Sequence, residues 1–448
     1  MLQLPFSYCF PVFLYLYNLL KIRYIVRLTE AFFKKFKAII LIGTILGFLF
    51  FLLISFFLPS LTSTTKRIGV VGRYTPDNLP EDIARSISKG LTKTDEFGQA
   101  QPDLAKSWET SDGGKTWIFI IANDLFWQDG KKLTANDINY EFSDAKFEIV
   151  DEQTIKFTLE SNFSAFPVIL SKSVFKKGLL GIGEYKVKKV SLVGGYVEKL
   201  IIQNKKFDTE TYKFYPTEER AKLAFELGQV DELRNLHSSS PFDNWKTVVV
   251  DKDISYHNFV GIFFNTEDEK FAEKSLRVSL NYALDKSAFS ENRASSPISP
   301  LSWGYNPQVK QYNLDSEKTD DIKDLEIKLS TLPNLLNTAE SIKKNWEEHG
   351  AKVQIEVTPN VPHQFEVFLA TVDIPKDPDQ YSLWHSTQTS TNVSRYKNAR
   401  IDKLLEDGRT EIDTEERKKI YIDFQRFLVE DSPAIFLYHP TLFNIIRK

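Results

Sequence analysis

Three carboxylates lie close together in VDIPKDPDQY, residues 372–381 of the chain. They are Asp373, Asp377 and Asp379, and they follow a strand that we predict at residues 365–370. A carboxylate fixed in a loop can hold the cationic group of a bound molecule through charge-assisted hydrogen bonds. Aspartate near proline also caps turns. The segment therefore predicts either a binding site for a cation-bearing ligand or a set of structural turns.

The sequence offers no residue pattern for catalysis, a metal or a cofactor. Its six histidines lack metal-ligand spacing such as HExxH, and no GxSxG elbow for a nucleophilic serine is present. The only cysteine, Cys9, lies in an apolar stretch, which excludes internal disulfides and cysteine-rich metal sites. We therefore expect a protein without enzymatic activity.

The net charge and the length of the chain limit which classes of protein function remain. The formal net charge is −3 and the pI is about 6.2, so the chain has no basic field that would attract nucleic acid. Residues 66–448 are numerous enough for two or more lobes, each with its own core. We exclude a nucleic-acid partner and expect a multi-lobed globular part.

A membrane span is predicted at residues 38–61, which carry no charge and are long enough to cross a bilayer. Cations precede it at residues 21–37, so residues 1–37 are expected in the cytoplasm and the chain from residue 66 outside. No small-x-small site ends the apolar run, which favours an uncleaved anchor over a signal peptide. Residues 1–20 are also apolar; a second span, an interfacial helix and a start codon placed too far upstream stay open.

Apolar spacing and turn residues predict alternating strands and helices after residue 66. We expect helices at 83–91, 138–142 (capped by Thr134), 214–227, 274–284, 339–349 and 417–430. Strands are expected at 68–72, in a hairpin turning at Asp112-Gly113-Gly114, in two short strands within 148–159, and at 186–193, 195–203, 256–265, 327–329, 353–357, 365–370 and 433–438. The alternation indicates an α/β fold.

Three pieces of the early chain together carry a family resemblance. They are Gly-Leu at 90–91, PDLAKSWE at 102–109, and GKTW at 114–117 continued by WQDGKKLTA at 127–135. AKLAFELGQVDEL at 221–233 and the spacing of Arg277, Tyr282 and Lys286 extend the match. The sequence closely resembles the extracytoplasmic solute-binding proteins of peptide-type ABC importers, family 5.

The resemblance implies a hinged, two-lobed periplasmic-binding-protein-like fold of class II. The first lobe would cover residues 66–260, the second 261–430, and 431–448 would return to the first lobe, with the strand at 433–438 as the return strand. The hinge would lie near 256–265. The stretch between Ala135 and Phe166 is shorter than in typical peptide binders, so we expect a reduced insert domain.

The same resemblance implies roles for side chains facing a cleft. Asp373 matches the position that holds a ligand's ammonium, and Asp377 matches the adjoining structural Asp-Pro-Asp. The loop containing Trp303 and Tyr305 resembles the family's cleft-facing loop; core packing is the alternative for both, as it is for Trp384, a further cleft-lining aromatic. Arg395 and Tyr396 resemble a stretch near the cleft, with a solvated surface loop as the alternative.

Two functions follow as hypotheses. The first is a membrane-anchored protein that captures a peptide or similar solute and delivers it to an ABC permease. The second is a sensory or scaffolding ectodomain that keeps the binding fold without transport, which the uncleaved span and reduced insert also fit. No cysteine follows the span, so lipid anchoring is not expected.

Overall fold

The computed structural model describes residues 27–28, 30–52 and 63–448. These residues divide into two units: one holds the described residues up to Thr64 together with residues 206–208, and the other holds residues 65–205 and 209–448. The first unit contains a helix, Glu30–Leu52, of 23 residues and mean hydropathy 2.0, which is long and apolar enough to cross a membrane. This helix begins before the predicted span at residue 38. Residues 53–61 of that span, and residues 1–20, lie outside the described residues.

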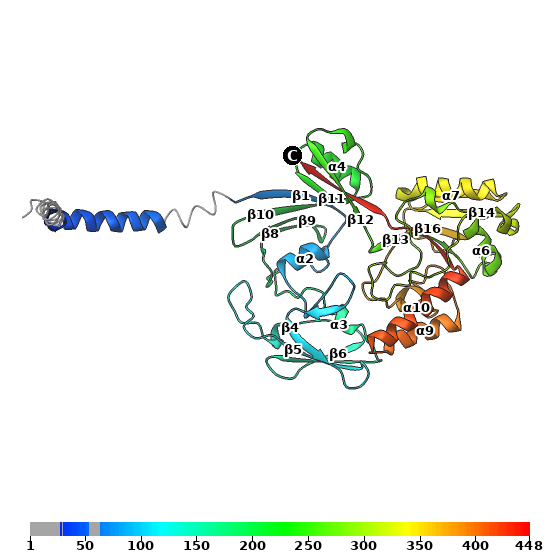
Figure 1. Ribbon diagram of the computed structural model, residues 1–448, viewed down its shortest axis with the longest axis horizontal. Helices are drawn as coiled ribbons and strands as arrows, with labels where there is room; N and C mark the ends of the chain where they lie inside the picture. Colours follow the sequence, from blue (N-terminus) through cyan, green and yellow to red (C-terminus); the bar gives the residue numbers. More distant parts are fainter. Residues whose placement is uncertain (1–26, 29, 53–62) are drawn as a thin grey trace, which may run out of the picture. The chain divides into compact units, whose positions relative to one another are not determined.

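The second unit opens with a seven-stranded sheet in the order β12-β18-β11-β1-β10-β9-β8 (Figure 1). Strands β1 and β10 are parallel, whereas β8, β9 and β10 follow one another antiparallel, as the predicted strand pair at 186–203 requires. The helix α4 (Glu218–Glu226) packs on this sheet. The strands are β1 Thr65–Val71, β8 Lys186–Val193, β9 Tyr196–Gln203, β10 Thr209–Tyr215, β11 Glu232–Leu236, β12 Val248–Ile254 and β18 Thr441–Arg447.

A smaller four-stranded antiparallel sheet has the order β4-β5-β7-β6 and its own apolar core. The predicted hairpin is confirmed, because β4 and β5 pair on either side of Asp112-Gly113-Gly114. Gly113 and Gly114 have φ of 72° and 89°, a region that glycine enters without strain. We call this sheet and the seven-stranded sheet, with their helices, the first lobe. The remaining elements are β2 Thr92–Thr94, β3 Ala100–Pro102, β4 Ala105–Glu109, β5 Thr116–Ile121, β6 Ala145–Ile149, β7 Thr154–Leu159, α2 Glu81–Ile87 and α3 Phe166–Ile169.

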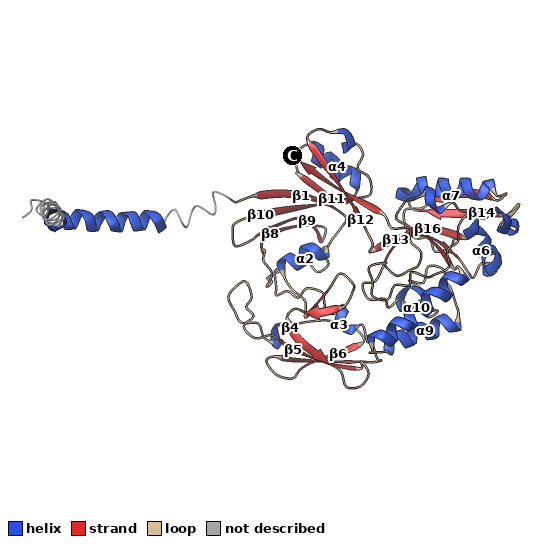
Figure 2. Ribbon diagram, viewed as in Figure 1, coloured by secondary structure: helices blue, strands red, loops and turns tan. Residues whose placement is uncertain are grey.

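A five-stranded sheet, β15-β14-β16-β13-β17, forms the centre of the second lobe. Helices cover both of its faces (Figure 2). The alternation along β13 explains this: Ile262 and Phe264 enter the core beneath α6 and α7, while Phe259 and Phe263 enter the core beneath α9 and α10. The elements are β13 Asn258–Phe264, β14 Glu326–Thr331, β15 Lys352–Val357, β16 Val367–Asp373, β17 Ala434–Tyr438, α5 Glu269–Ala272, α6 Lys274–Tyr282, α7 Leu336–Glu348, α8 Tyr381–Trp384, α9 Ala399–Thr410 and α10 Thr414–Asp431.

The chain passes between the two large sheets twice. The first passage lies between Ile254 at the end of β12 and Asn258 at the start of β13. The second lies between Tyr438 at the end of β17 and Thr441 at the start of β18. The prediction that 433–438 returns to the first lobe is wrong, because β17 pairs with β13 and the return is made by β18. The lobe boundaries and the hinge stay predictions.

Three predicted helices differ from the structure. The helix predicted at 83–91 ends at Ile87, and Leu91 instead lies just before β2, buried in the core of the four-stranded sheet. After Thr134 the helix has only three residues, Ala135–Asp137, and residues 138–142 are not helical. Ile138 and Tyr140 are buried in the core of the four-stranded sheet, which an extended chain allows at alternate positions. The helix predicted at 214–227 begins only at Glu218, since Phe214 and Tyr215 belong to β10.

Candidate functional site

Asp373 ends β16 beside the first passage between the sheets. In the β13–β16 ladder it lies opposite Asn258, whose side-chain amide donates a hydrogen bond to its Oδ1. Asn258 is itself fixed by Ser255, whose hydroxyl donates to the Asn258 Oδ1 over 2.6 Å. The Asp373 residue is exposed, so its second carboxylate oxygen is available to a ligand.

Asp373 lines a cavity of about 650 Å³ formed by both lobes. Five carboxylates and two cations line it: Glu81, Asp82, Asp95, Glu96 and Asp373 against Arg85 and Lys376. Both cations already have carboxylate partners, since Arg85 lies 3.5 Å from Asp103 and Lys376 pairs with Glu81. Within the described residues, Asp373 and Glu96 have no cation at ion-pair distance. The cavity therefore has excess negative charge and favours a cationic group.

Lys376 crosses from the second lobe to the first. Its ammonium donates to Glu81 and, over 3.2 Å, to the hydroxyl of Thr94. The backbone approaches there as well, because a Cβ on Gly98 would lie 2.0 Å from the Lys376 carbonyl oxygen. Glycine is thus required at position 98, and the lobes touch at the rim of the cavity.

Asp377 lies in a different environment, beside a second interlobe cavity of about 450 Å³. Its two carboxylate oxygens accept hydrogen bonds of 2.7 and 3.0 Å from Arg417 on α10. The two side chains are 9% and 7% exposed. The Asp377 carboxylate raises the pKa of Arg417, against the opposing effect of burial. The Asp377 carboxylate and the Arg417 guanidinium thus form a bidentate ion pair, and each uses the other as its partner.

Asp379 lies two residues before the short helix α8 and accepts a 3.0 Å hydrogen bond from the Tyr381 backbone N–H. Its side chain is 11% exposed and lies 3.6 Å from Arg409. Burial raises the pKa of the Asp379 carboxyl, although Arg409 acts in the opposite direction. Asp379 therefore has a structural role in this loop.

Arg409, at the end of α9, forms a second contact between the lobes. Its guanidinium lies between the rings of Phe163 and Tyr381, 4.4 and 4.5 Å from their centroids. Its carbonyl oxygen accepts hydrogen bonds from the backbone N–H of Ser164 at 2.8 Å and from the Ser164 hydroxyl at 3.0 Å. Phe163 and Ser164 belong to the first lobe, so this contact and Lys376 join the two lobes.

The aromatic residues predicted for the cleft lie at different depths. Trp303 lines the smaller cavity, packs edge-on against Tyr421 and donates its backbone N–H to the Phe97 carbonyl of the first lobe over 3.2 Å. Tyr305 is half-buried against the core of the second lobe. Trp384 is 2% exposed and stacks on Phe263 in that core. Only Trp303 of the three lines either interlobe cavity.

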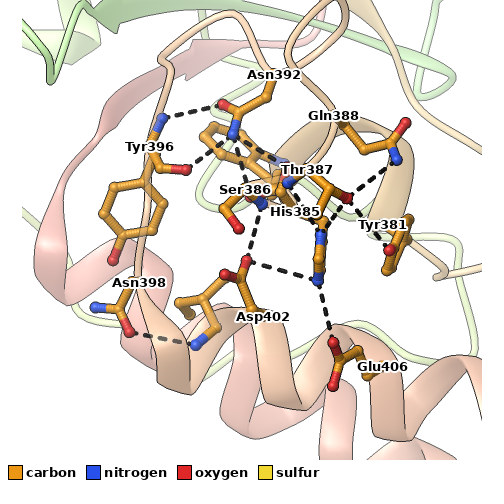
Figure 3. Close-up of polar contacts among 12 residues, drawn as sticks. Tyr381, His385, Ser386, Thr387, Gln388, Asn392, Tyr396, Asn398, Asp402 and Glu406 are labelled. Atoms are coloured by element: carbon orange, nitrogen blue, oxygen red, sulfur yellow. Dashed lines mark hydrogen bonds and ion pairs between the residues drawn. The ribbon is translucent and has the colours of Figure 1, made fainter.

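Arg395 and Tyr396 lie in a loop fastened to the second lobe. Arg395 has a φ of 51°, donates to the His363 carbonyl and lies 3.9 Å from Glu267. Tyr396 is buried and donates its hydroxyl to Asp431 over 2.5 Å. Figure 3 shows the side-chain amide of Asn392 bonded to the Tyr396 backbone, which closes this loop on itself. Neither predicted residue lines the two interlobe cavities.

The structure adds cavity residues that the sequence did not indicate. Glu81, Arg85 and Asn258 lie far from Asp373 along the chain, and Lys376 and Glu81 are 295 positions apart. No spacing rule connects such positions. The one signal was an acidic first turn in α2, where Glu81 and Asp82 stand. Among the described residues, no group of three or more His, Cys, Asp or Glu side chains is placed to hold a metal ion.

Comparison with known proteins agrees with this architecture. The chain is 26% identical to the oligopeptide-binding protein AppA of Bacillus subtilis, over 82% of this chain and 83% of that one. It is 23% identical to the dipeptide-binding protein of Escherichia coli, over 78% and 82%. The crystal structure of NikZ from Campylobacter jejuni in complex with Ni(L-His) superposes with a TM-score of 0.71 at 24% identity, covering 86% of this chain and 94% of that one.

The sequence profile of one family covers most of the globular part. The profile of the bacterial extracellular solute-binding proteins, family 5 (middle region), matches residues 99–393. This range contains the four-stranded sheet, most of the second lobe and the Asp373 loop. The chain belongs to the bacterial extracellular solute-binding proteins of family 5.

Proposed function

We propose that this protein binds a peptide between its lobes, holding the peptide's α-ammonium at Asp373, and delivers it to an ABC permease. The observation that carries the proposal is the exposed Asp373 carboxylate in a cavity with excess negative charge. An ammonium there would gain a charge-assisted hydrogen bond and Coulomb attraction together.

The relatives favour a peptide among cationic ligands. Two of them are named as oligopeptide- and dipeptide-binding proteins. The adjacent cavity beside Trp303 gives an extended chain further room, about 450 Å³, with the aromatic rings of Trp108 and Trp117 along it. Aromatic walls accept varied side chains without specific hydrogen bonds. A peptide that starts at Asp373 could continue there.

The proposal includes membrane attachment and lobe closure. The helix Glu30–Leu52 would anchor the protein with the two lobes outside the cytoplasm. Closure would be a hinge motion at the two passages between the sheets, stabilised by contacts that the ligand makes only in the closed state. The role is binding, with no catalytic residue assigned.

Isothermal titration of the full chain in phosphatidylcholine nanodiscs tests the proposal. We expect trialanine to bind and N-acetyl-trialanine to bind about 10- to 100-fold more weakly, since a hydrogen bond to a charged group contributes about 1.5–3 kcal/mol. Equal affinity for both peptides would show that Asp373 does not hold the ammonium. Failure of a mixed di- to pentapeptide library to bind would overturn peptide capture itself.

A further inference from the structure

The first lobe has a groove that is separate from both interlobe cavities. It lies between α4 and the β9–β10 part of the seven-stranded sheet and has a volume of about 980 Å³. None of its lining residues lines either interlobe cavity. Peptide capture at Asp373 therefore gives this groove no role.

Four cations surround the groove: Arg73, Lys199, Lys213 and Arg220. Glu198 is the single carboxylate among the lining residues. In the part of the chain that the structure describes, none of these four cations has a carboxylate at ion-pair distance. The chain as a whole has a net charge of −3, so the groove concentrates positive charge against the overall balance.

Apolar side chains stand exposed among these cations. On α4, Leu223 is 53% exposed, and Leu227, directly after the helix, is 65% exposed. At the tip of the β8–β9 hairpin, Val193 is 64% and Tyr196 is 43% exposed. Tyr196 is partly engaged, because the Arg73 guanidinium lies over its ring at 5.8 Å from the centroid. Single exposed apolar residues are common, but Leu223, Leu227 and Val193 around one groove whose cations lack carboxylate partners form a surface that a partner would stabilise.

We propose that this groove, defined by Arg73, Lys199, Lys213, Arg220, Leu223 and Leu227, docks an acidic segment of a partner protein. The segment carries carboxylates on both sides of apolar side chains. The carboxylates pair with the four cations, and the apolar side chains cover the leucines. Charge complementarity selects this occupant, because a basic segment or a peptide ammonium would be repelled.

The first experiment uses a defined probe on the full chain in phosphatidylcholine nanodiscs. The probe is a fluorescein-labelled, N-acetylated and C-amidated peptide of alternating Glu and Leu pairs, followed by fluorescence anisotropy. Acetylation removes the ammonium that the Asp373 site requires, so the two sites are read separately. Saturating trialanine should leave probe binding unchanged, and replacing each Glu of the probe with Gln should weaken it at least about tenfold.

Matched double variants locate the binding. K199Q/K213Q removes two groove cations, whereas K186Q/K188Q removes two exposed cations of β8 outside the groove. Lys199 and Lys213 are half-buried, whereas the two control lysines are exposed. We expect K199Q/K213Q to weaken the probe about five- to tenfold and K186Q/K188Q less than about twofold, from the usual size of charge pairs near a protein surface. Equal weakening by both, or none by the first, would overturn the proposal.

A lipid readout separates a membrane from a protein partner. Lys199 and Lys213 are tested for protection from amine acetylation after phosphatidylglycerol replaces phosphatidylcholine in the nanodiscs. We expect no protection. Protection together with no probe binding would overturn the proposal in favour of an anionic lipid surface.

Discussion

Asp373 ends the strand β16 and Asp377 follows it by four positions, yet their carboxylates lie in opposite physical environments. Asp373 is exposed, accepts one hydrogen bond from the Asn258 amide and looks into an acidic cavity. Asp377 is buried and takes two hydrogen bonds from Arg417. The first carboxylate has free acceptor capacity, and the second has a dedicated cation.

The difference separates an exposed carboxylate with an open oxygen from a buried and paired carboxylate within a few residues. A buried carboxylate needs its partner, because an unpaired charge in a protein interior is strongly unfavourable. An exposed carboxylate is hydrated in the empty protein, and a ligand's cation can replace that water. The carboxylate therefore needs no permanent partner within the protein. Asp377 thus holds the loop, and Asp373 is available for the ligand.

We expect Asp377→Asn to cause the largest change, a loss of unfolding free energy. It leaves the buried Arg417 guanidinium without a counter-charge, and breaking a buried pair in this way costs about 3–5 kcal/mol. Chemical denaturation followed by tryptophan fluorescence measures the loss. The matched control is Asp423→Asn, which breaks the exposed Arg426 pair on the same helix, at side-chain exposures of 49% and 48%, and should cost less than about 0.5 kcal/mol. Equal losses of unfolding free energy in the two variants would show that burial of the ion pair does not decide its contribution to stability.

Asp373→Asn should show the opposite profile. We expect little change in unfolding free energy, within about 0.5 kcal/mol, because the side chain is exposed. Trialanine affinity should fall by about 1.5–3 kcal/mol, the contribution of a charged hydrogen bond. Calorimetry on this variant and on Asp251→Asn, an exposed position of β12 outside the cavity, checks the result. Unchanged affinity in Asp373→Asn would assign the ammonium to another carboxylate, with Glu96 next to test.

Much of the fold could be predicted from local patterns. Alternation and turn residues located β5, β7, β8 and β9, and the family resemblance supplied the two-lobed arrangement. The errors arose where tertiary packing overrides local signals. Thr134 does cap a helix, but that helix has only three residues, because Ile138 and Tyr140 are drawn into the core of the four-stranded sheet. The strand β17 looked like a return strand because nothing local reveals which sheet it joins.

The site was less predictable, for a physical reason. The sequence alone does not distinguish the roles of the three aspartates, Asp373, Asp377 and Asp379. Only their burial in the folded protein does. The ion pair of Asp377 depends on Arg417, 40 positions away, and the cavity around Asp373 depends on α2, almost 300 positions away. Trp384 and Tyr396 were indistinguishable from cleft residues for the same reason, and both are buried in the second lobe.

Asp379 is a third case, because its nearby cation, Arg409, offsets the cost of burying the carboxylate less fully than Arg417 does for Asp377. Its folded pKa is raised above the unfolded value near 3.8. Between these two values the folded state binds more protons than the unfolded state, so this carboxyl makes stability fall as pH rises, by at most about 1.4 kcal/mol per pH unit. Asp379→Asn should therefore gain stability relative to wild type as the pH rises above the unfolded pKa near 3.8, measured by urea denaturation. A relative loss over that range would mean that Arg409 outweighs the cost of burial.

The smallest effect belongs to Lys376, which lies between the two aspartates in sequence and reaches across to Glu81. The two side chains are 33% and 49% exposed, so the pair should contribute only about 0.2–1 kcal/mol. A double-mutant cycle of Lys376→Met and Glu81→Gln, by denaturation at low and high salt, measures the coupling between the two side chains, which salt should weaken.

We also expect Lys376→Met to strengthen trialanine binding slightly, since the substitution removes a cation from the cavity of Asp373. A coupling above about 2 kcal/mol, insensitive to salt, would instead place Lys376 with the structural pair of Asp377 and Arg417.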